Sequence, residues 1–451
     1  MTDSQKHVSY APTAGLCYDP AEPVYWDSRG LDAEVVRAFE ICNGCRMCFK
    51  YCDSFPVLFE MLDGRHQMDA RRLQPADVER VFDACFQCKL CEVQCPYTPR
   101  DKHEFMLDFP KLVHRWRAVH GKARSRTLRQ RLLGDPDTAG RMARLSFGMA
   151  NLVNRLGPAR WLMEKVAGIH RKKQLPDFAR QAFDAWAEKN GYVRPEPGGE
   201  VVLFQTCFVQ HNEPGLGVDT LEVLRKNGVD AWVVKGLACC GMPAWEHGDL
   251  ESLRRQARRY LDLLMPYVEA GAKVLAINPT CCMMMRREWP ELLEGADRER
   301  ARKLAPQVMD PGEFLWSIRN EPRFNASFKS TPPGGAVAYH APCHLRAQAV
   351  GFKGRDLLRK IPGVTVSATV MECCGHDGTF AMTVEGFEPS RRIGEKAFAG
   401  MKAGQAETWV TDCPLAAIQF QQHAGKKPLH PMSVLARAYR EDGFGKKGGA
   451  S

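Results

Sequence analysis

Two stretches decide how the first part of this chain folds: CNGCRMCFKYC at residues 42–52 and CFQCKLCEVQCP at residues 85–96. In each stretch three cysteines recur at intervals of three residues, and a fourth follows four positions later. Three thiols at this spacing can surround one face of a metal cluster, while the turn carries the fourth thiol away from them. The two stretches therefore predict metal binding by thiolates.

The same spacing is found in bacterial two-cluster ferredoxins, in which the fourth cysteine of each run binds the cluster of the other run. Zinc sites instead use two cysteine pairs separated by a spacer, which neither stretch resembles. Asp53 follows Cys52 where Pro96 follows Cys95, but the proline only shapes a turn, so we expect both runs to bind iron. One 4Fe-4S cluster is expected on Cys42, Cys45, Cys48 and Cys95, and a second on Cys85, Cys88, Cys91 and Cys52.

Length and composition describe a globular chain of 451 residues, 44% of them hydrophobic, with room for about three domains. The start of the chain, MTDSQKHVSY, has no apolar segment of the kind that secretory signals carry, and eighteen cysteines in so large a chain do not indicate a disulfide framework. We therefore expect a reducing cytoplasmic location. The mean hydropathy is −0.36 and no long apolar run occurs, so any membrane contact is expected to be peripheral.

Helical patterns surround the two cysteine runs. Residues 31–40 and 75–84 place apolar side chains at helical spacing just before each run, and the spacer at residues 53–84 is also helix-forming. We therefore predict an all-α two-cluster ferredoxin domain at residues 31–108, preceded by an N-terminal tail at residues 1–30.

A basic helical segment is predicted at residues 109–195. Between residues 111 and 190 there are 18 Lys and Arg against 6 Asp and Glu, a local charge of +12 in a chain whose net charge is +10. Gly157-Pro158 ends one predicted amphipathic helix and Trp161 lies in the next. The apolar stripe of the first helix, at steps of three and four residues, is Met142, Leu145, Met149, Leu152 and Leu156.

Three interpretations of this segment stay open: contact with a lipid surface, docking to an acidic partner subunit, and a solvated helix face. A fourth, nucleic-acid binding, is disfavoured, because no helix-turn-helix or zinc-finger pattern accompanies the charge and we expect no nucleic-acid partner.

An internal repeat follows the Pro- and Gly-rich breaks at residues 195–199 and 331–335. In each copy an apolar strand precedes a single cysteine, a Cys-Cys-Gly sequence follows about 30 positions later, and another cysteine follows about 40 positions after that. The apolar strands alternate with helical stretches, so we predict two duplicated parallel α/β domains at residues 196–330 and 331–446. Together with the ferredoxin domain this makes an α+β multidomain chain.

The duplicated cysteines are expected to converge where the strands end, and to hold one or two further iron-sulfur clusters. A disulfide between adjacent cysteines is strained, whereas adjacent thiolates can bridge metal atoms, and the following glycine lets the backbone approach. Structural zinc stays open as the alternative, since sets of four thiolates suit either metal. The candidate ligands are Cys207, Cys239, Cys240 and Cys281 in the first copy, and Cys343, Cys373, Cys374 and Cys413 in the second.

This arrangement of cysteines resembles that of the cysteine-rich iron-sulfur oxidoreductase family. Short local sequences support the resemblance, among them Thr280-Cys281, Pro342-Cys343-His344-Leu345 and Asp412-Cys413. That family includes subunits of anaerobic glycerol-3-phosphate dehydrogenase, of glycolate and lactate oxidation, and of heterodisulfide reductase. The resemblance implies an electron-transfer subunit. Its donor would be a flavoprotein dehydrogenase acting on a 2-hydroxy acid or glycerol 3-phosphate, and its acceptor a quinone or another protein. Peripheral contact with the inner face of the plasma membrane, through residues 111–190, stays open for this chain, which we expect to be cytoplasmic.

The alternative implied by the same family is a heterodisulfide reductase-like catalyst that reduces a disulfide or related group at a cluster. Members of that kind end each repeat in Cys-x-x-Cys, but here Met284 and Ala416 stand where the additional cysteine would be. An ordinary 4Fe-4S cluster, or one completed by a non-cysteine ligand, therefore remains open, and His376 is the candidate ligand.

Two histidines near the motifs have expected roles, and two cysteines have none. His340 and His344 flank Cys343 and are expected to donate hydrogen bonds to a cluster or to carry protons. Cys17 and Cys282 receive no role. The sequence contains no G-x-G-x-x-G after a strand and no phosphate-binding G-x-x-x-x-G-K-[ST], so we expect electrons to enter from another protein.

Overall fold

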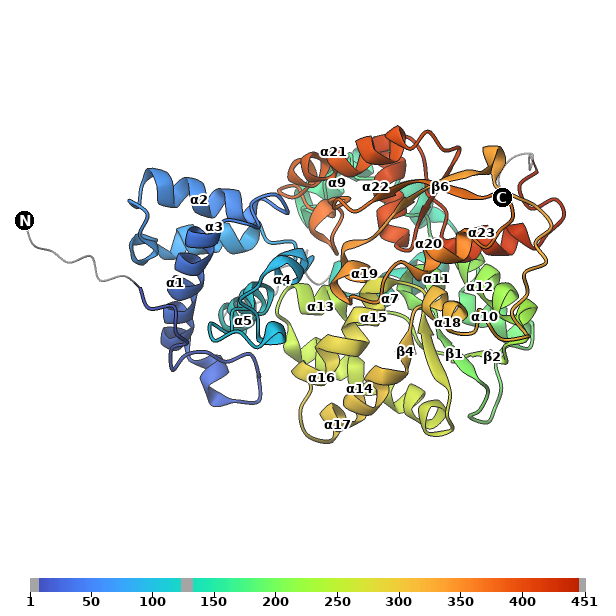
Figure 1. Cartoon of the computed structure of the whole chain (residues 1–451), viewed down its shortest axis with the longest axis horizontal. Helices are drawn as coiled ribbons and strands as arrows, with labels where there is room; N and C mark the ends of the chain where they lie inside the picture. The colour runs from blue at the N-terminus through green and yellow to red at the C-terminus, as the bar shows by residue number, and fades with distance from the viewer. Residues whose placement is uncertain (1–7, 123–132, 446–451) are drawn as a thin grey trace, which may run out of the picture. The chain divides into compact units, whose positions relative to one another are not determined.

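The computed structural model describes residues 8–122 and 133–445; residues 123–132 of the predicted basic segment, and both termini, lie outside the described residues. The chain divides into two compact units. Unit 1 comprises residues 1–126 with 244–250, and unit 2 comprises residues 127–243 with 251–451 (Figure 1).

The described residues of unit 1 form helices and no strand. The helices expected near both cysteine runs are present, as α1 and α3. Asp27 starts α1 because its carboxylate accepts hydrogen bonds from the amides of Arg29 and Gly30. The helices are α1 (Ser28–Cys45), α2 (Ser54–Gly64), α3 (Pro75–Asp83), α4 (Leu90–Gln94) and α5 (Phe109–Lys122), with short 3₁₀ turns at Pro23–Trp26, Ala70–Arg72 and Pro99–Asp101.

Aromatic side chains join these helices into one core. The ring of Phe82 from α3 meets Phe39 of α1 edge-on at 5.5 Å and Trp116 of α5 at 5.3 Å. Phe55 of α2 lies 4.7 Å from Phe109 of α5. Such pairs bury large apolar areas and add a preferred geometry. The core therefore holds the helix ends that carry the cysteines.

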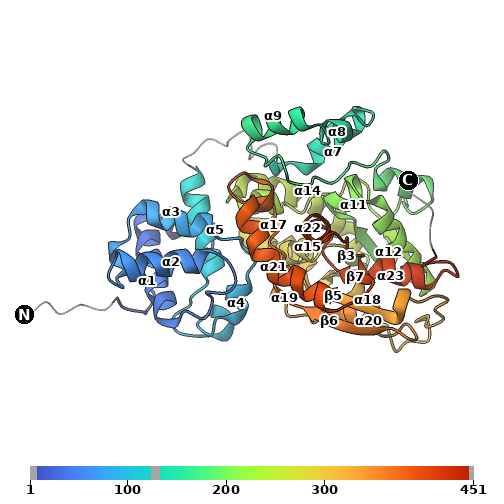
Figure 2. The ribbon, with the colours of Figure 1, turned by 90° about the horizontal axis from the view of Figure 1, so that it is seen from above.

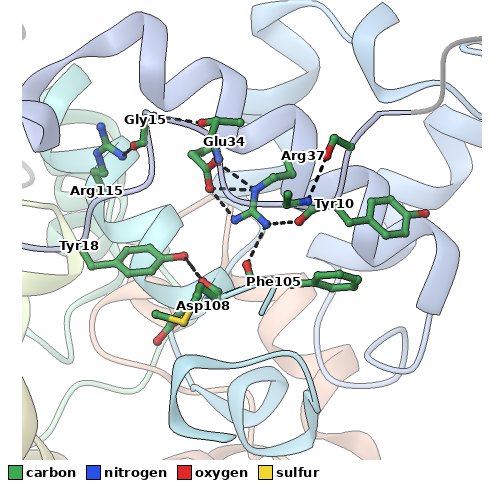
Figure 3. Close-up of polar contacts among 12 residues, drawn as sticks. Tyr10, Gly15, Tyr18, Glu34, Arg37, Phe105, Asp108 and Arg115 are labelled. Carbon is green, nitrogen blue, oxygen red and sulfur yellow. Dashed lines mark hydrogen bonds and ion pairs between the residues drawn. The ribbon is translucent and has the colours of Figure 1, made fainter. Parts of the chain in front are cut away.

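Two buried arginines tie the predicted N-terminal tail to unit 1 (Figure 3). The guanidinium of Arg37 pairs with Glu34 at 2.6 Å and donates to the carbonyl of Tyr10 at 2.8 Å. The guanidinium of Arg115 donates to the carbonyl of Gly15 at 2.6 Å. Charged donors that are buried need such partners, so these tail residues form part of the packed unit.

Unit 2 contains two parallel sheets of the same strand order. The first has the order β2-β1-β3-β4 and the second β6-β5-β7, so each repeat places its first strand between its second and third. The prediction of duplicated parallel α/β domains is confirmed. The strands are β1 (Val201–Phe204), β2 (Ala231–Val233), β3 (Lys273–Ala276), β4 (Val308–Met309), β5 (Ala336–His340), β6 (Thr365–Val370) and β7 (Thr408–Thr411).

Helices alternate with these strands. Those of the first repeat are α11 (Thr206–His211), α12 (Pro214–Lys226), α13 (Met242–Glu246), α14 (Leu250–Glu269), α15 (Pro279–Met283), α16 (Trp289–Leu292), α17 (Gly295–Leu304) and α18 (Pro311–Ser317), with a π turn at Met284–Glu288. Those of the second repeat are α19 (Cys343–Ala347), α20 (Lys353–Leu358), α21 (Phe387–Ala403), α22 (Pro414–Ala424) and α23 (Pro431–Ala438).

The last helix of each repeat packs against the other repeat. Asp310 caps α18 and His430 caps α23, each directly after an extended segment at the edge of its sheet. Helix α18 packs against α20, and α23 packs against α12. One hydrophobic core therefore contains side chains of both repeats, among them Leu203, Leu275, Tyr339 and Leu435.

The predicted basic segment is divided between the units: residues 109–122 form α5 of unit 1. Its part in unit 2 forms α7 (Pro136–Leu145), α8 (Met149–Val153), α9 (Gly157–Ala167) and α10 (Phe183–Lys189), and Figure 2 shows α8 and α9 along the outer edge of that unit. The single helix expected through the apolar stripe is wrong. Phe147 and Gly148 adopt left-handed backbone, with φ of 50° and 94°, and interrupt it. Among the described helices none is long and apolar enough to cross a bilayer.

Candidate iron-sulfur sites

The first expected ligand set of unit 1 lies at the end of α1 and after α4. Burial, followed by the charges of Cys48, Cys95 and Cys45, raises the pKa of Cys42 well above its usual value. Such coupling requires the four thiols to lie close together. Arg46, in left-handed backbone with φ of 54°, ends α1 and begins the turn between them.

The second expected set forms a similar group. Burial, and then the charges of Cys88, Cys85, Cys48 and Cys52, raises the pKa of Cys91. Gln87 and Lys89, on either side of Cys88, both have left-handed backbone, with φ of 58° and 60°. Strained backbone of this kind persists where the surrounding structure enforces it and is common at functional sites. Cys52 thus lies with the three thiols of the later run.

The first repeat brings its four cysteines together where its strands end. Cys207 lies in α11 after β1, Cys239-Cys240 follows β2, and Cys281 lies in α15 after β3. The thiol of Cys207 donates a hydrogen bond to Cys239, which lowers the pKa of Cys239 to about 5 and raises that of Cys207. The amide of Gly241 also donates to the Cys239 sulfur, at 3.4 Å. These donors favour a thiolate, the form that binds metal.

The second repeat reproduces this arrangement. A hydrogen bond with Cys343 lowers the pKa of Cys373, and the amide of Gly375 donates to the Cys373 sulfur at 3.3 Å. Burial, followed by the charges of Cys373 and Cys413, raises the pKa of Cys374. Four thiols again converge after three parallel strands, so both repeats present equivalent donor sets.

The glycine after each cysteine pair is required by its conformation and its surroundings. Gly241 and Gly375 have φ of 88° and 77°. A Cβ atom would lie 2.6 Å from Leu253 Cδ1 at the first position and 2.0 Å from the Ser390 carbonyl oxygen at the second. The backbone therefore turns tightly beneath the thiols and points an amide at one of them.

The two duplicated sites adjoin. Burial raises the pKa of Cys413 to about 11, and the charge of Cys281 in the other repeat adds to this increase. Across the same boundary, Thr280 Oγ1 and His344 Nδ1 lie 2.8 Å apart. Gln348 Nε2 donates to the Pro279 carbonyl at 2.9 Å. The last cysteines of the two repeats are therefore neighbours.

The thiols of both repeats suit a soft metal. Hydrogen bonds link Cys207 to Cys239, Cys239 to Cys240 and Cys343 to Cys373. Sets of four thiols are donors for iron-sulfur clusters and for structural zinc alike. Among the described residues, no group of three or more His, Cys, Asp or Glu side chains is placed to hold a single metal ion. The donor sets therefore fit an iron-sulfur cluster.

Three histidines near the second site differ in their partners. His340 Nδ1 lies 3.0 Å from Thr411 Oγ1 and His340 Nε2 lies 3.1 Å from the Glu372 carbonyl. His344 contacts Thr280, as described above. His376 is 2% exposed, and neither of its ring nitrogens has a hydrogen-bond partner among the described residues. Burial lowers the pKa of His376 well below its usual value.

The remaining cysteines lie apart from these groups. Cys282 is buried and its thiol lies 3.4 Å from the Ala276 carbonyl of β3. Cys17 contacts the Asp19 carbonyl at 3.4 Å. Met284 and Ala416, at the positions of the missing additional ligands, are both buried.

Two charged residues that sequence reasoning missed lie beside the duplicated sites: Asp137 of α7 and Lys173 after α9. Both come from the basic segment, far from the cysteines in sequence. No local pattern marks either residue, because an isolated carboxylate or lysine in a charged segment has no distinguishing spacing.

Two protein-family models match the parts of the chain that carry the cysteines. The family model described as "4Fe-4S dicluster domain" matches residues 41–98, and the one described as "Cysteine-rich domain" matches residues 201–286 and 337–421. The chain contains a 4Fe-4S dicluster domain and two copies of a cysteine-rich domain. Its cofactors are therefore iron-sulfur clusters, and it is a component of an oxidoreductase.

Individual relatives of this iron-sulfur protein are oxidoreductase subunits or utilization proteins. One subunit of the anaerobic glycerol-3-phosphate dehydrogenase of Escherichia coli (strain K12) is 27% identical over 72% of this chain and 81% of its own length. One subunit of the fumarate reductase (CoM/CoB) of Methanothermobacter marburgensis is 26% identical over 55% of this chain and 48% of its own length. A lactate utilization protein of Bacillus cytotoxicus is 26% identical over 48% of this chain and 87% of its own length.

Proposed function

We propose that this chain is an electron-transfer subunit that receives electrons from a flavoprotein dehydrogenase acting on glycerol 3-phosphate or a 2-hydroxy acid. Electrons pass through unit 1 and the duplicated sites of unit 2 to a quinone or another acceptor. When bound, the clusters supply single-electron exchange, so a flavin is needed to divide the two electrons taken from carbon. The observation that carries the proposal is the combination of a two-cluster unit with two adjoining four-thiol sites in one chain.

The proposed ligands are the sixteen cysteines outside Cys17 and Cys282. Within unit 1 they divide into the two crossed sets expected from the spacing, and within unit 2 into one set for each repeat. The boundaries at residues 31–108, 109–195, 196–330 and 331–446 are proposed as the ferredoxin domain, the basic segment and the two cysteine-rich domains. The burial or partial burial of all sixteen cysteines, the amide donors at Gly241 and Gly375, and the coupled thiol pairs support this assignment.

The relay is tested with anaerobically purified protein. We expect it to exchange electrons with artificial dyes, and to show no turnover of glycerol 3-phosphate, lactate or glycolate until a flavoprotein dehydrogenase is added. Substrate oxidation by the chain alone would contradict the proposal.

The second candidate function is reduction of a disulfide or related group at a duplicated site. The adjoining positions of Cys281 and Cys413 favour it, since two neighbouring sites could act on one substrate. Met284 and Ala416 in place of additional cysteines weigh against it. Consumption of a disulfide by the lone chain with reduced dye, lost in Cys374→Ser, would establish this function instead.

We also propose that the basic segment contacts the inner face of the plasma membrane, from the cytoplasmic side. The exposed fractions of Met142, Leu145 and Phe147 are 66%, 76% and 96%. Leu152, Leu156, Trp161 and Leu162 are also exposed. Exposed apolar side chains on a basic segment, whose sequence carries a charge of +12 between residues 111 and 190, are typical of helices that lie in an anionic lipid interface.

Vesicle flotation tests this contact. Leu145→Ser with Phe147→Ser should weaken binding to vesicles that contain anionic phospholipid, whereas Val24→Ser, at an exposed apolar residue of unit 1, should not. Binding should also fall as salt rises. If the double variant floats like wild type but loses a partner subunit in pull-down, the segment is a docking face for protein; if neither assay changes, it is a solvated face.

A further inference from the structure

The basic segment supplies a carboxylate to the first duplicated site. Asp137 lies in the first turn of α7, and its Oδ2 accepts hydrogen bonds from the Tyr260 hydroxyl at 3.1 Å and from the amide of Cys239 at 3.4 Å. The negative charge of Asp137 contributes to raising the pKa of Cys207. A carboxylate of the basic segment thus contacts the backbone of Cys239, a proposed ligand.

The position of Asp137 is fixed by close packing of α7 on α11. Asp137 Oδ1 lies 3.3 Å from His211 Nε2, and Arg144 lies 2.6 Å from the other nitrogen of that ring. A Cβ atom on Gly140 would approach the His211 ring to 2.4 Å, so only glycine permits this contact. Arg144 therefore partly offsets the carboxylate, but from the far side of the imidazole.

The same segment supplies an ammonium to the second duplicated site. Lys173 is 2% exposed, its Nζ donates to Gln419 Oε1 at 2.5 Å, and Gln419 donates in turn to Ser390 at 2.8 Å. The carbonyl oxygen of the same Ser390 lies 2.0 Å from the position of a Cβ on Gly375. Lys173 is therefore joined through Gln419 and Ser390 to the loop of Cys374, and its charge reaches that thiol. Burial lowers the pKa of Lys173 to about 8, which leaves the ammonium largely protonated at neutral pH.

The backbone around Lys173 is held from two sides. Arg160 of α9 donates to the carbonyls of His170 and Lys173 at 2.9 and 2.8 Å. Gln422 of α22 donates to the carbonyl of Lys172 at 2.7 Å. A buried ammonium is costly unless its surroundings are built for it, and these contacts make such a site.

Other charges lie near the second site as well. Arg346 lowers the pKa of Cys373, and Asp412 raises that of Cys413. Burial raises the pKa of Asp412 itself to about 7, which weakens its negative charge at neutral pH. At the first site Asp137 contributes to the electrostatics of both Cys207 and Cys239.

We propose that the basic segment sets the direction of electron transfer between the duplicated sites, with Asp137 making the first site harder to reduce and Lys173 making the second easier to reduce. An added electron is repelled by a nearby carboxylate and attracted by a nearby ammonium, and both effects are strong where water is excluded. One electron leaves the first site and the same electron reduces the second. The second site is therefore the exit toward the acceptor.

This inference rests on the proposed relay but is measured without the partner proteins. Reduction potentials of the two sites are determined by dye-mediated titration of the full chain with electron paramagnetic resonance, and Cys240→Ser and Cys374→Ser assign each signal to its site. Asp137→Asn should raise the potential of the first site, and Lys173→Met should lower that of the second. We expect each to change the electron-exchange equilibrium between the sites by about tenfold, which is about 59 mV for one electron.

Matched variants separate charge from disturbance. Asp137→Glu and Lys173→Arg keep the charge, so the potential of each site should stay close to its wild-type value. Asp177→Asn and Lys172→Met remove exposed charges of the same segment and should leave both potentials unchanged. If one neutral variant loses iron, the other still tests its own signed expectation.

Unchanged potentials in iron-replete Asp137→Asn and Lys173→Met, or shifts of the opposite sign, would overturn the inference. The relay itself would fail by a different result, namely no electron exchange between the wild-type chain and an added flavoprotein. The two failures are therefore distinguishable.

Discussion

The two cysteine-rich repeats share a scaffold and differ in the charges that face it. Both have the same order of three parallel strands, the same amide-to-sulfur hydrogen bond and the same left-handed glycine. They differ in that the basic segment brings the carboxylate of Asp137 to the first set of thiols and the ammonium of Lys173 to the second, and in that Met242 of the first repeat corresponds to His376 of the second. Both repeats thus have the same cysteines, while the basic segment brings a different charge to each site.

The largest expected effect comes from variants that remove one duplicated site at a time. Cys240→Ser and Cys374→Ser should each lose about four iron atoms, the content of one cube, while the ferredoxin signals stay intact because no ligand is shared. Chemical iron analysis and electron paramagnetic resonance measure this. An iron count equal to wild type in either variant would refute ligation at that repeat.

Alanine substitutions of the two glycines should destabilise the two repeats by different amounts. Gly375→Ala places a Cβ against a backbone oxygen, whereas Gly241→Ala meets the end of a leucine side chain. We expect losses in the free energy of unfolding of about 4 kcal/mol and about 2 kcal/mol, from left-handed strain plus overpacking.

The control for this pair is Gly363→Ala, which has φ of 77° and nothing within 4 Å of its Cβ position. It should cost about 1 kcal/mol, from strain alone. Anaerobic urea unfolding compares the three variants. Equal losses for all three would show that the contacts at Gly241 and Gly375 do not matter.

Loosening the loop that carries Lys173 should affect only the second repeat. Arg160→Met removes charged donors to buried carbonyls, and we expect a loss of about 2 kcal/mol in the free energy of unfolding. Arg155→Met, which breaks an exposed ion pair with Asp177, should change it by less than about 0.5 kcal/mol. The first-site potential should stay unchanged in both variants. A shift of the first-site potential would mean that the part of the basic segment that carries Lys173 also affects the part that carries Asp137.

The smallest expected effect concerns the histidine that distinguishes the second repeat. His376→Met copies the first repeat and removes a buried imidazole with no hydrogen-bond partner among the described residues. We expect unchanged iron content and a gain of about 1 kcal/mol in the free energy of unfolding. Loss of iron from the second site would instead identify His376 as a ligand.

Local spacing predicted much of this molecule. The intervals between cysteines indicated the dicluster domain, and the apolar stretches before Cys207 and Cys343 indicated parallel strands, because both features depend on neighbouring residues. The break at Phe147 and Gly148 was missed, since the apolar stripe continues through it. Asp137 and Lys173 could not be found, because their role arises from long-range packing of the basic segment on both repeats.

The exchange of terminal helices between the repeats has a consequence for how the protein folds. Because α18 packs on α20 and α23 packs on α12, each repeat contributes apolar side chains to one core that the two repeats share. A chain cut near residue 331 would give two halves with uncovered apolar faces, and we expect each to aggregate alone. We therefore expect the two repeats to unfold in a single cooperative transition.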